Sequence, residues 1–356
     1  MKKIFLLPLA LFAFVACNDD DSGYVAPIEQ ISEGTLLGTP EAPLGLGGSN
    51  QQNAVYVDLS GEDVIPLSRG SWDLGFYSGS SNRVVINGAV AMAAKKLETT
   101  DITAVQQQDL TVAVGTFQAS NMAFVDSPTG DLNATVFGDI AASEAEASVY
   151  LVNLGNKIPT TPADLGSVNT AGTPRGWKKV KIWATTTGYT MQYANLDATT
   201  AQTVNIVKDP LYNFTLFSLE AGALAAAEPQ AAEWDLKFTT FTNEVFQGGA
   251  SAGAYFFSDY VVTNTRGGVT SVAIDGDAAA YNAFNLAAFN SGNHQLSNDQ
   301  RAIGEHWRDV FTRTTFEDVF FVVKDAAGNL YKIRFLAMVS AEGERGFPSF
   351  QYALLQ

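Results

Sequence analysis

The sequence predicts a mainly β protein made of two tandem antiparallel β-rich modules with a few short helices. Three observations predict this fold class. Charged residues make up 16% of the chain and aromatic residues 11%, a composition that favours strands over long helices. Apolar and polar residues alternate with a period of two in most patterned segments. A set of landmarks occurs twice, in one order and at nearly equal spacing, which indicates an internal duplication.

The chain begins with a targeting segment that is not part of this fold. Lys2-Lys3 precedes an apolar run over residues 4–16, the pattern of a secretory signal peptide, and the run is shorter than the about 20 apolar residues of a membrane span. The sequence Phe14-Val15-Ala16-Cys17 resembles a lipobox, and Cys17 is the only Cys in the chain. We therefore expect residues 1–16 to be a signal peptide and Cys17 to carry a lipid anchor. An ordinary signal peptide followed by an incidental Cys is the alternative.

The segment after Cys17 predicts a tether and a location. The acidic run at residues 18–22 resembles the surface-export signal of Bacteroidetes lipoproteins, and a solvated spacer is the alternative. Residues 17–53 are rich in Gly, Pro, Ser and Glu, so we expect the lipidated Cys to be followed by a flexible tether. A single Cys excludes intrachain disulfides. The expected location is the outer membrane, lipid-anchored and exposed at the cell surface.

The charge of the mature chain excludes one class of partner. Loss of residues 1–16 removes two of the 21 basic residues and none of the 37 acidic ones, leaving a formal charge of 19 − 37 = −18 with His neutral. Such a charge repels nucleic acids and anionic membrane surfaces. We therefore expect no nucleic-acid partner, and contact with the membrane through the lipid alone.

The duplication is defined by motifs near the two ends of each copy. Trp72-Asp73-Leu74-Gly75-Phe76 recurs as Trp234-Asp235-Leu236-Lys237-Phe238, and Gln192-Tyr193-Ala194 recurs as Gln351-Tyr352-Ala353. The Trp-to-Gln spacing is 120 residues (72 to 192) in the first copy and 117 (234 to 351) in the second. This spacing predicts a first module over residues 54–200 and a second over residues 201–356.

Each copy contains alternating segments that predict strands and hairpins. In the second copy, Asp325-Ala326-Ala327-Gly328-Asn329 provides good hairpin-loop chemistry, and in the first copy an insertion over residues 159–176 enlarges the corresponding loop. Two segments are expected to be helical instead: residues 278–289, and residues 297–303 with Ser297 as N-cap. The expected strands, in chain order, cover residues 55–59, 83–88, 149–152, 179–183, 214–219, 255–263, 319–323 and 332–336.

These landmarks resemble the HmuY-like family of Bacteroidetes surface lipoproteins. The resemblance covers most of both modules, and it implies a β-rich fold without enzymatic activity. The characterised members of the family capture haem at the cell surface and transfer it to an outer-membrane receptor or transporter, and the resemblance implies the same role for this chain. The residues that carry it are Trp72–Phe76 with Arg83–Gly88 in the first copy, and Trp234–Phe238, Ile303–Trp307 and Val319–Phe335 in the second.

The haem ligands implied by this resemblance are two His or two Met side chains, and here the chain departs from the family pattern. Its two His residues, His294 and His306, both lie in the second module, and neither stands where the family places its ligands relative to the Trp and the hairpin. Imidazole nitrogens are suitable axial ligands, so His294 and His306 are the haem-ligand candidates if the 297–303 helix folds back. A loop His and a His packed against Trp307 are the alternative.

Methionines of the first module provide a second ligand hypothesis for haem. Met92, Met122 and Met191 carry thioether sulfurs that are able to bind haem iron. Methionine also commonly fills gaps in apolar cores, so core packing is the alternative for all three residues.

One enzyme motif needs to be weighed. Gly249-Ala250-Ser251-Ala252-Gly253 matches G-x-S-x-G and makes Ser251 the candidate nucleophile of a serine hydrolase, with an Asp and a His downstream. That mechanism needs a strand before the Ser and a helix after it, whereas residues 255–263 have the pattern of a strand. Zinc, P-loop and dinucleotide signatures are absent from the sequence. We therefore expect no enzyme, no catalytic residue and no metal site.

The sequence as a whole predicts a surface lipoprotein that binds haem, or a related small ligand, and hands it to an outer-membrane transporter. A surface interaction or scaffold module without a small ligand is the alternative, and a serine hydrolase acting through Ser251 is a more remote one.

Overall fold

The computed structural model describes residues 33–36 and 45–356. The expected signal peptide, Cys17 and most of the expected tether lie outside the described residues. Within the described ranges the chain is mainly β, which confirms the predicted fold class, and every pairing between its strands is antiparallel. No described helix is long and apolar enough to cross a membrane.

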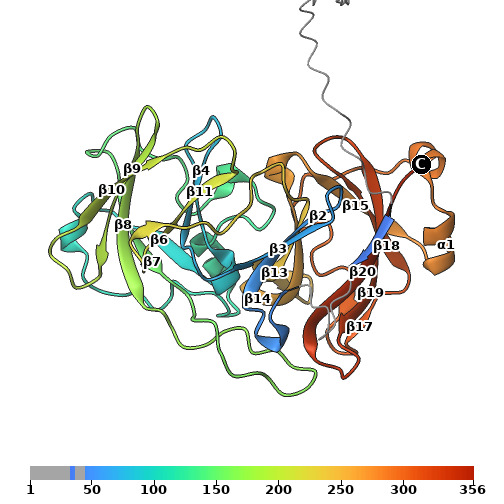
Figure 1. Ribbon diagram of the computed structural model, residues 1–356. Helices are drawn as coiled ribbons and strands as arrows, with labels where there is room; N and C mark the ends of the chain where they lie inside the picture. Colours follow the sequence, from blue (N-terminus) through green and yellow to red (C-terminus); the bar gives the residue numbers. More distant parts are fainter. Residues whose placement is uncertain (1–32, 37–44) are drawn as a thin grey trace, which may run out of the picture. The chain divides into compact units, whose positions relative to one another are not determined.

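Two outer sheets, each of five strands, lie at opposite sides of the view in Figure 1. The order of the first is β10-β9-β8-β7-β6, and that of the second is β1-β20-β19-β18-β15. Their strands are β6 (Ala93–Lys96), β7 (Val149–Asn153), β8 (Trp177–Ala184), β9 (Gly188–Asn195), β10 (Gln202–Val207), β1 (Glu33–Leu36), β15 (Thr270–Asp275), β18 (Val319–Lys324), β19 (Leu330–Val339) and β20 (Arg345–Leu354).

Two inner sheets, each of four strands, lie between them (Figure 1). Their orders are β12-β11-β4-β5 and β14-β13-β2-β3, and β16 (Arg308–Asp309) and β17 (Thr314–Thr315) form a separate two-stranded sheet next to β19. The inner strands are β4 (Leu74–Tyr77), β5 (Val84–Ile86), β11 (Phe214–Ser218), β12 (Ala223–Leu224), β2 (Asn53–Asp58), β3 (Asp63–Ser68), β13 (Leu236–Gln247) and β14 (Ala250–Thr263).

The inner sheets exchange strands between the two expected modules. Strand β2 precedes the first Trp-Asp motif, yet it pairs with β13, which follows the second motif, with Val57 opposite Leu236. Strand β11 precedes the second motif and pairs with β4, which follows the first, with Phe217 opposite Leu74. Pairing therefore crosses the expected boundary near residue 200, and the modules 54–200 and 201–356 stay a prediction.

Each pair of inner and outer sheets encloses a separate apolar core. One core packs side chains of β4, β5 and β11 against those of β6 to β9, with Phe76, Tyr189 and Met191 fully buried. The other packs β2 and β13 against β18 to β20, with Phe238 and Phe335 at its centre. In this core, Phe238 stacks on Phe350 with ring centroids 5.4 Å apart.

The expected helix over residues 278–289 forms as two short helices. These are α1 (Ala278–Ala283) and α2 (Leu286–Ser291). Between them Phe284 adopts an extended backbone, and the Asn285 side chain accepts a hydrogen bond from Ala288 N at 2.9 Å, so Asn285 begins a new helix. Short polar side chains of this kind favour caps over helix interiors.

The expected helix over residues 297–303 is wrong. Ser297 N donates to Ser271 O at 2.9 Å, so this residue extends the edge of a sheet. Ser297 Oγ accepts from Asp299 N, and Asp299 Oδ1 accepts from Arg301 N. Side-chain bonds to backbone groups two residues ahead offer an alternative to helical hydrogen bonds, and here they fold the segment into turns.

Part of the segment expected to be a flexible tether is packed. Leu46 is 1% exposed and Gln51 is fully buried. Gln51 Nε2 donates to Asp259 Oδ1 at 2.7 Å, and β1 pairs with β20.

The described residues also form short 3-10 helices: η1 (Gly48–Asn50), η2 (Gly88–Val90), η3 (Ile102–Ala104), η4 (Ala119–Phe124), η5 (Leu132–Ala134) and η6 (Thr265–Gly267).

Candidate functional site

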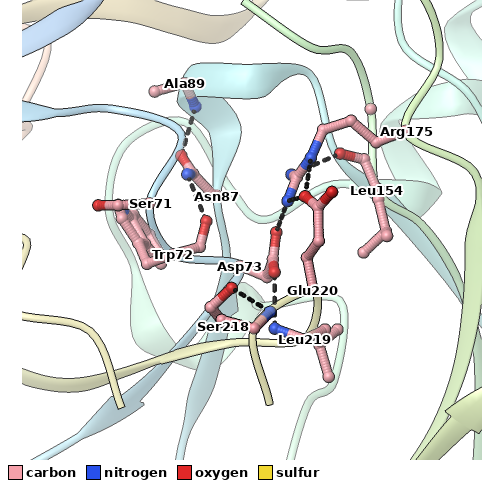
Figure 2. A network of polar contacts seen from close by, with 12 residues as sticks. Ser71, Trp72, Asp73, Asn87, Ala89, Leu154, Arg175, Ser218, Leu219 and Glu220 are labelled. Atoms are coloured by element: carbon pink, nitrogen blue, oxygen red, sulfur yellow. Dashed lines mark hydrogen bonds and ion pairs between the residues drawn. The ribbon is translucent and has the colours of Figure 1, made fainter. Parts of the chain in front are cut away.

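The first Trp-Asp motif belongs to a buried polar network, which Figure 2 shows. The Asp73 side chain is fully buried, and Arg175 Nη2 lies 2.8 Å from its Oδ1. The other carboxylate oxygen accepts a hydrogen bond from Leu219 N at 2.7 Å. Arg175 also donates to Leu154 O and pairs with Glu220 at 3.1 Å. Asp73 thus ties β4 to the end of β11 and to the loop that carries Arg175.

The second Trp-Asp motif repeats this arrangement without the arginine. Leu59 N donates to Asp235 Oδ2 at 2.9 Å, as Leu219 N does to Asp73. No basic side chain in the described part of the chain forms an ion pair with Asp235. Burial, together with the nearby carboxylates of Asp58 and Asp325, raises the pKa of the Asp235 carboxyl to about 7, and the hydrogen bond from Leu59 N opposes this shift.

An asparagine completes each motif in the same way. Asn87 Nδ2 donates to Trp72 O, and Asn264 Nδ2 donates to Trp234 O, both at 2.8 Å. The backbone N–H of each Asn donates to the carbonyl oxygen of the Asp in its own motif at 2.9 Å. Backbone groups therefore satisfy the side chains of the two asparagines and one carboxylate oxygen of each aspartate, and we assign Asp73, Asp235, Asn87 and Asn264 to the fold.

A pair of lysines matches between the copies as well. Lys179 Nζ donates to three backbone carbonyls, those of Val105, Leu196 and Ala198. Lys332 Nζ donates to the carbonyls of Tyr281 at 2.8 Å, Asn282 at 3.3 Å and Phe284 at 2.8 Å, all around the end of α1. These lysines hold loops against the outer sheets.

A cavity lies where the two inner sheets meet. Thr240 Oγ1 donates to Ala89 O and Thr242 Oγ1 donates to Gly88 O. These hydrogen bonds fix β13 against η2 at the edge of the cavity. The cavity has a volume of about 150 Å³. Its apolar wall comes from both expected modules and includes Trp72, Val85, Met92, Phe214, Leu216 and Phe241.

The cavity also contains polar groups that the fold does not use. Thr239 is 2% exposed, and its hydroxyl has no hydrogen-bond partner within the described residues. The same is true of the buried Oε1 of Glu228. Burial raises the pKa of the Glu228 carboxyl to about 7, and Lys237 and Asn213 oppose this shift. Unpartnered buried oxygens cost stability, which makes them candidates for contact with a ligand.

A second buried carboxylate faces the same space. Asp126 lines the cavity, and its two oxygens accept hydrogen bonds from Ile86 N at 2.7 Å and Val136 N at 2.8 Å. Burial nevertheless raises the pKa of this carboxyl to about 7. Each oxygen of a carboxylate has a further lone pair, so Asp126 keeps acceptor capacity for a bound molecule.

The ammonium group of Lys237, which also lines the cavity, lies over two aromatic rings. Lys237 Nζ lies 5.7 Å from the ring centroids of both Tyr56 and Trp234. Burial lowers the pKa of this ammonium group, and Glu228 raises it. Sequence reasoning placed Lys237 in the repeated motif without a role, although a lysine where the first copy has Gly75 was a signal. Glu228, Asp126 and Thr239 lie in no pattern that singles them out.

The two candidate haem ligands have different surroundings. His294 stacks on Phe289 with ring centroids 5.6 Å apart and meets the edge of Phe284 at 5.7 Å. His306 is exposed. Neither lines the cavity. The helix expected to bring the two imidazoles together is absent from residues 297–303, so their role as a ligand pair stays a prediction.

The methionines of the first module are also separated. Met92 is fully buried and lines the cavity, whereas Met191 is fully buried in the core. Met122 belongs to η4 and is partly exposed. Among the described residues, no group of three or more His, Cys, Asp or Glu side chains is arranged to hold a metal ion.

Ser251 does not occupy a nucleophile elbow. It lies in β14 at a bulge opposite Phe246, and the strand continues to Thr263. Its hydroxyl accepts a hydrogen bond from Gly253 N at 3.2 Å. A strained turn into a helix, which the hydrolase mechanism requires, does not occur at this position.

Comparison with known proteins gives one family match. A family model described as HmuY protein matches residues 50–352. No curated protein matches the chain. Among solved structures, the chain is similar to apo PinO from Porphyromonas gingivitis, at 14% sequence identity over 46% of this chain and 91% of that chain, with a TM-score of 0.15.

Proposed function

The chain belongs to the HmuY protein family, and from this membership we propose that it is a non-enzymatic, lipid-anchored binding protein of the cell surface. It captures a small ligand, either haem or a molecule that has replaced haem, and hands it to an outer-membrane transporter. The family is one of haem-binding surface proteins. The lipid on Cys17, the surface location and the transporter partner are parts of the proposal.

The cavity between the inner sheets is the observation that favours ligand capture. Its lining residues all lie within the matched range of 50–352. Binding sites are commonly apolar pockets at the junction of two structural units, with a few convergent polar groups. Unpartnered oxygens of Glu228 and Thr239 in this cavity favour a ligand over the alternative of a scaffold module without one.

The same geometry favours replacement of haem over its retention. Pockets for drug-sized ligands measure about 300–1,000 Å³, and this cavity has about 150 Å³. His294 is packed against Phe284 and Phe289, whereas His306 is exposed. The proposed ligand of the cavity is therefore smaller than haem.

Titration of the mature protein with haemin, followed by absorption spectroscopy, tests this choice. We expect that neither His294 nor His306 is needed for any shift of the Soret band. A shift that disappears in both His294→Ala and His306→Ala would restore haem as the ligand. Protease treatment of intact cells tests the location, since the proposal requires release of the protein and full protection would contradict it.

A further inference from the structure

The charges around the cavity point to the class of ligand. Five ionisable side chains line it: the acids Asp126, Asp131 and Glu228, and the bases Lys237 and Arg266. Above pH 7, where the carboxyls of Asp126 and Glu228 are ionised, three acids against two bases give a formal charge of −1. Asp131 and Arg266 are exposed, so the deep part of the cavity contains two carboxylates and one ammonium, again with a net charge of −1.

The one deep cation is already engaged. Lys237 Nζ lies over the rings of Tyr56 and Trp234, and such an arrangement is favourable for an ammonium group. An anionic ligand would bring a further negative charge next to Asp126 and Glu228. A buried charge without a partner is costly, so a ligand with one positive charge completes the balance.

The size and the wall of the cavity limit the rest of the ligand. A cavity of about 150 Å³ accepts a molecule the size of benzene. Trp72, Phe214 and Phe241 line it with Met92, which suits a short apolar body. Thr239 Oγ1 and Glu228 Oε1 have no partner among the described residues and provide acceptors for N–H donors.

We propose that the cavity between the inner sheets binds a small organic amine, with its ammonium group on Glu228 and Asp126 and its apolar part against Trp72 and Phe214. This proposal rests on the proposed role in ligand capture and names the class of ligand. Gln300 Nε2 donates to Pro128 O at 2.9 Å and Arg266 Nη2 donates to Gly130 O, so these two side chains fix the segment after Asp126 beside the cavity.

The test uses the full mature chain labelled at its methionine methyl groups, at pH 8, where Asp126 and Glu228 are ionised, and three probes of equal length: butylamine, 1-butanol and butyrate. Met92 lines the cavity, whereas Met338 is buried in the other core. Butylamine is expected to shift the Met92 methyl signal and to leave the Met338 signal unchanged. Its dissociation constant is expected to be at least about tenfold lower than those of the other two probes, because charge-assisted hydrogen bonds are the strong ones.

Variants locate the ammonium group. Glu228→Gln preserves size and is expected to weaken butylamine binding by about 10- to 100-fold. Asp235→Asn is the matched control, because it removes a buried carboxylate that does not line the cavity, and binding should be unchanged. Thr239→Val, which keeps the shape of the side chain, is expected to weaken binding several-fold. Thermal melting of each variant shows that it is folded.

Three results would overturn the amine site. The first is that butyrate binds as tightly as butylamine. The second is that folded Glu228→Gln binds butylamine as tightly as the unchanged protein. The third is that no probe shifts the Met92 methyl signal, which would mean that the cavity holds only water. The haemin titration and the surface protease treatment are separate measurements. If the probes do not bind but the protease releases the protein from intact cells, the amine site is wrong and the proposed capture role still stands. If the protein is fully protected from the protease, the capture role at the surface is contradicted, whatever the probes show.

Discussion

Asp73 and Asp235 occupy matching positions in the two Trp-Asp motifs, but only Asp73 has a cationic partner. Arg175 Nη2 lies 2.8 Å from Asp73 Oδ1, whereas Asp235 has Asp58 and Asp325 as its charged neighbours. Both carboxylates accept one backbone N–H at the end of the neighbouring strand. The same motif therefore contains a compensated buried charge in one place and an uncompensated one in the other, and substitutions at the two sites should have opposite effects.

We expect Asp73→Asn to destabilise the protein by about 3 kcal/mol, because removal of one partner leaves a buried charge unpaired. The Arg175 side chain is 4% exposed and keeps only the exposed Glu220 as an anionic neighbour. Urea unfolding at pH 7.5 measures the change. Glu220→Gln is the matched control and should cost less than about 1 kcal/mol, since exposed ion pairs contribute little. Equal losses in both variants would contradict the assignment.

We expect Asp235→Asn to stabilise the protein at pH 8. The asparagine Oδ1 still accepts from Leu59 N, and the cost of burying a charge beside Asp58 and Asp325 is removed. A shift of one pKa unit corresponds to about 1.4 kcal/mol, so the gain should be of the order of a few kcal/mol. Unfolding curves at pH 8 and pH 4.5 separate this effect from packing, because the gain should be nearly absent at the lower pH.

The pH dependence of stability follows from the same carboxyls. Burial raises the pKa values of Asp126, Glu228 and Asp235 to about 7 in the folded protein, so between about pH 4 and pH 7 the folded state binds more protons than the unfolded state. Stability contributed by these groups is therefore greatest near pH 4 and is lost as the pH rises through 7. The free energy of unfolding, measured from pH 4.5 to 8.5, should decrease, and Asp235→Asn should flatten the slope. An increase through pH 7 would contradict the raised pKa values of these carboxyls.

Lys332→Met should destabilise the region around α1. Its ammonium group donates to the partly buried carbonyls of Tyr281 and Phe284 and to the exposed carbonyl of Asn282, and hydrogen bonds to a charged group contribute about 1.5–3 kcal/mol. We expect a loss of about 2 kcal/mol by urea unfolding, together with faster hydrogen exchange of amides in residues 278–291. Arg334→Met, on the same strand, is the control. The same exchange rates in both variants would exclude a local role for Lys332.

Cys17→Ala tests the anchor. The chain has a formal net charge of −16, so without the proposed lipid it has no other expected affinity for an anionic membrane. The variant should move from the membrane fraction to the soluble fraction of fractionated cells while its thermal melting temperature stays unchanged. Full retention in the membrane fraction would show that another element holds the protein there.

Local patterns were sufficient for four strands of the outer sheets, β7, β8, β18 and β19, and for one hairpin turn, whereas the other six outer strands were not predicted. The alternation over residues 332–336 lies within β19, and the Asp325–Asn329 turn is closed by hydrogen bonds from Asn329 N to Asp325 Oδ1 and from Gly328 N to Asp325 O. These features depend on residues close in the chain, so a sequence pattern determines them.

Partners distant in the chain were not predictable in the same way. Strands β2 and β11 precede equivalent motifs and have similar alternation. The strand that follows either motif, β4 or β13, was therefore an equally suitable partner for each of them, and only the tertiary structure selects the exchanged pairing. The cavity was missed for the same reason. Glu228 and Asp126 lie about 100 residues apart in segments without periodicity, and only packing of the inner sheets brings them to one space.

The exchange of strands in the inner sheets has a consequence for export. In the export that we propose, the N-terminal end crosses the membrane first, so Asn53–Asp58 (β2) reaches the far side well before Leu236–Gln247 (β13), its partner. Until then β2 and β3 form a two-stranded hairpin, which is marginal on its own, and their unpaired edge is open to other chains. In such an export, folding cannot proceed module by module, and we expect the early half of the chain to need protection from aggregation until the late half arrives.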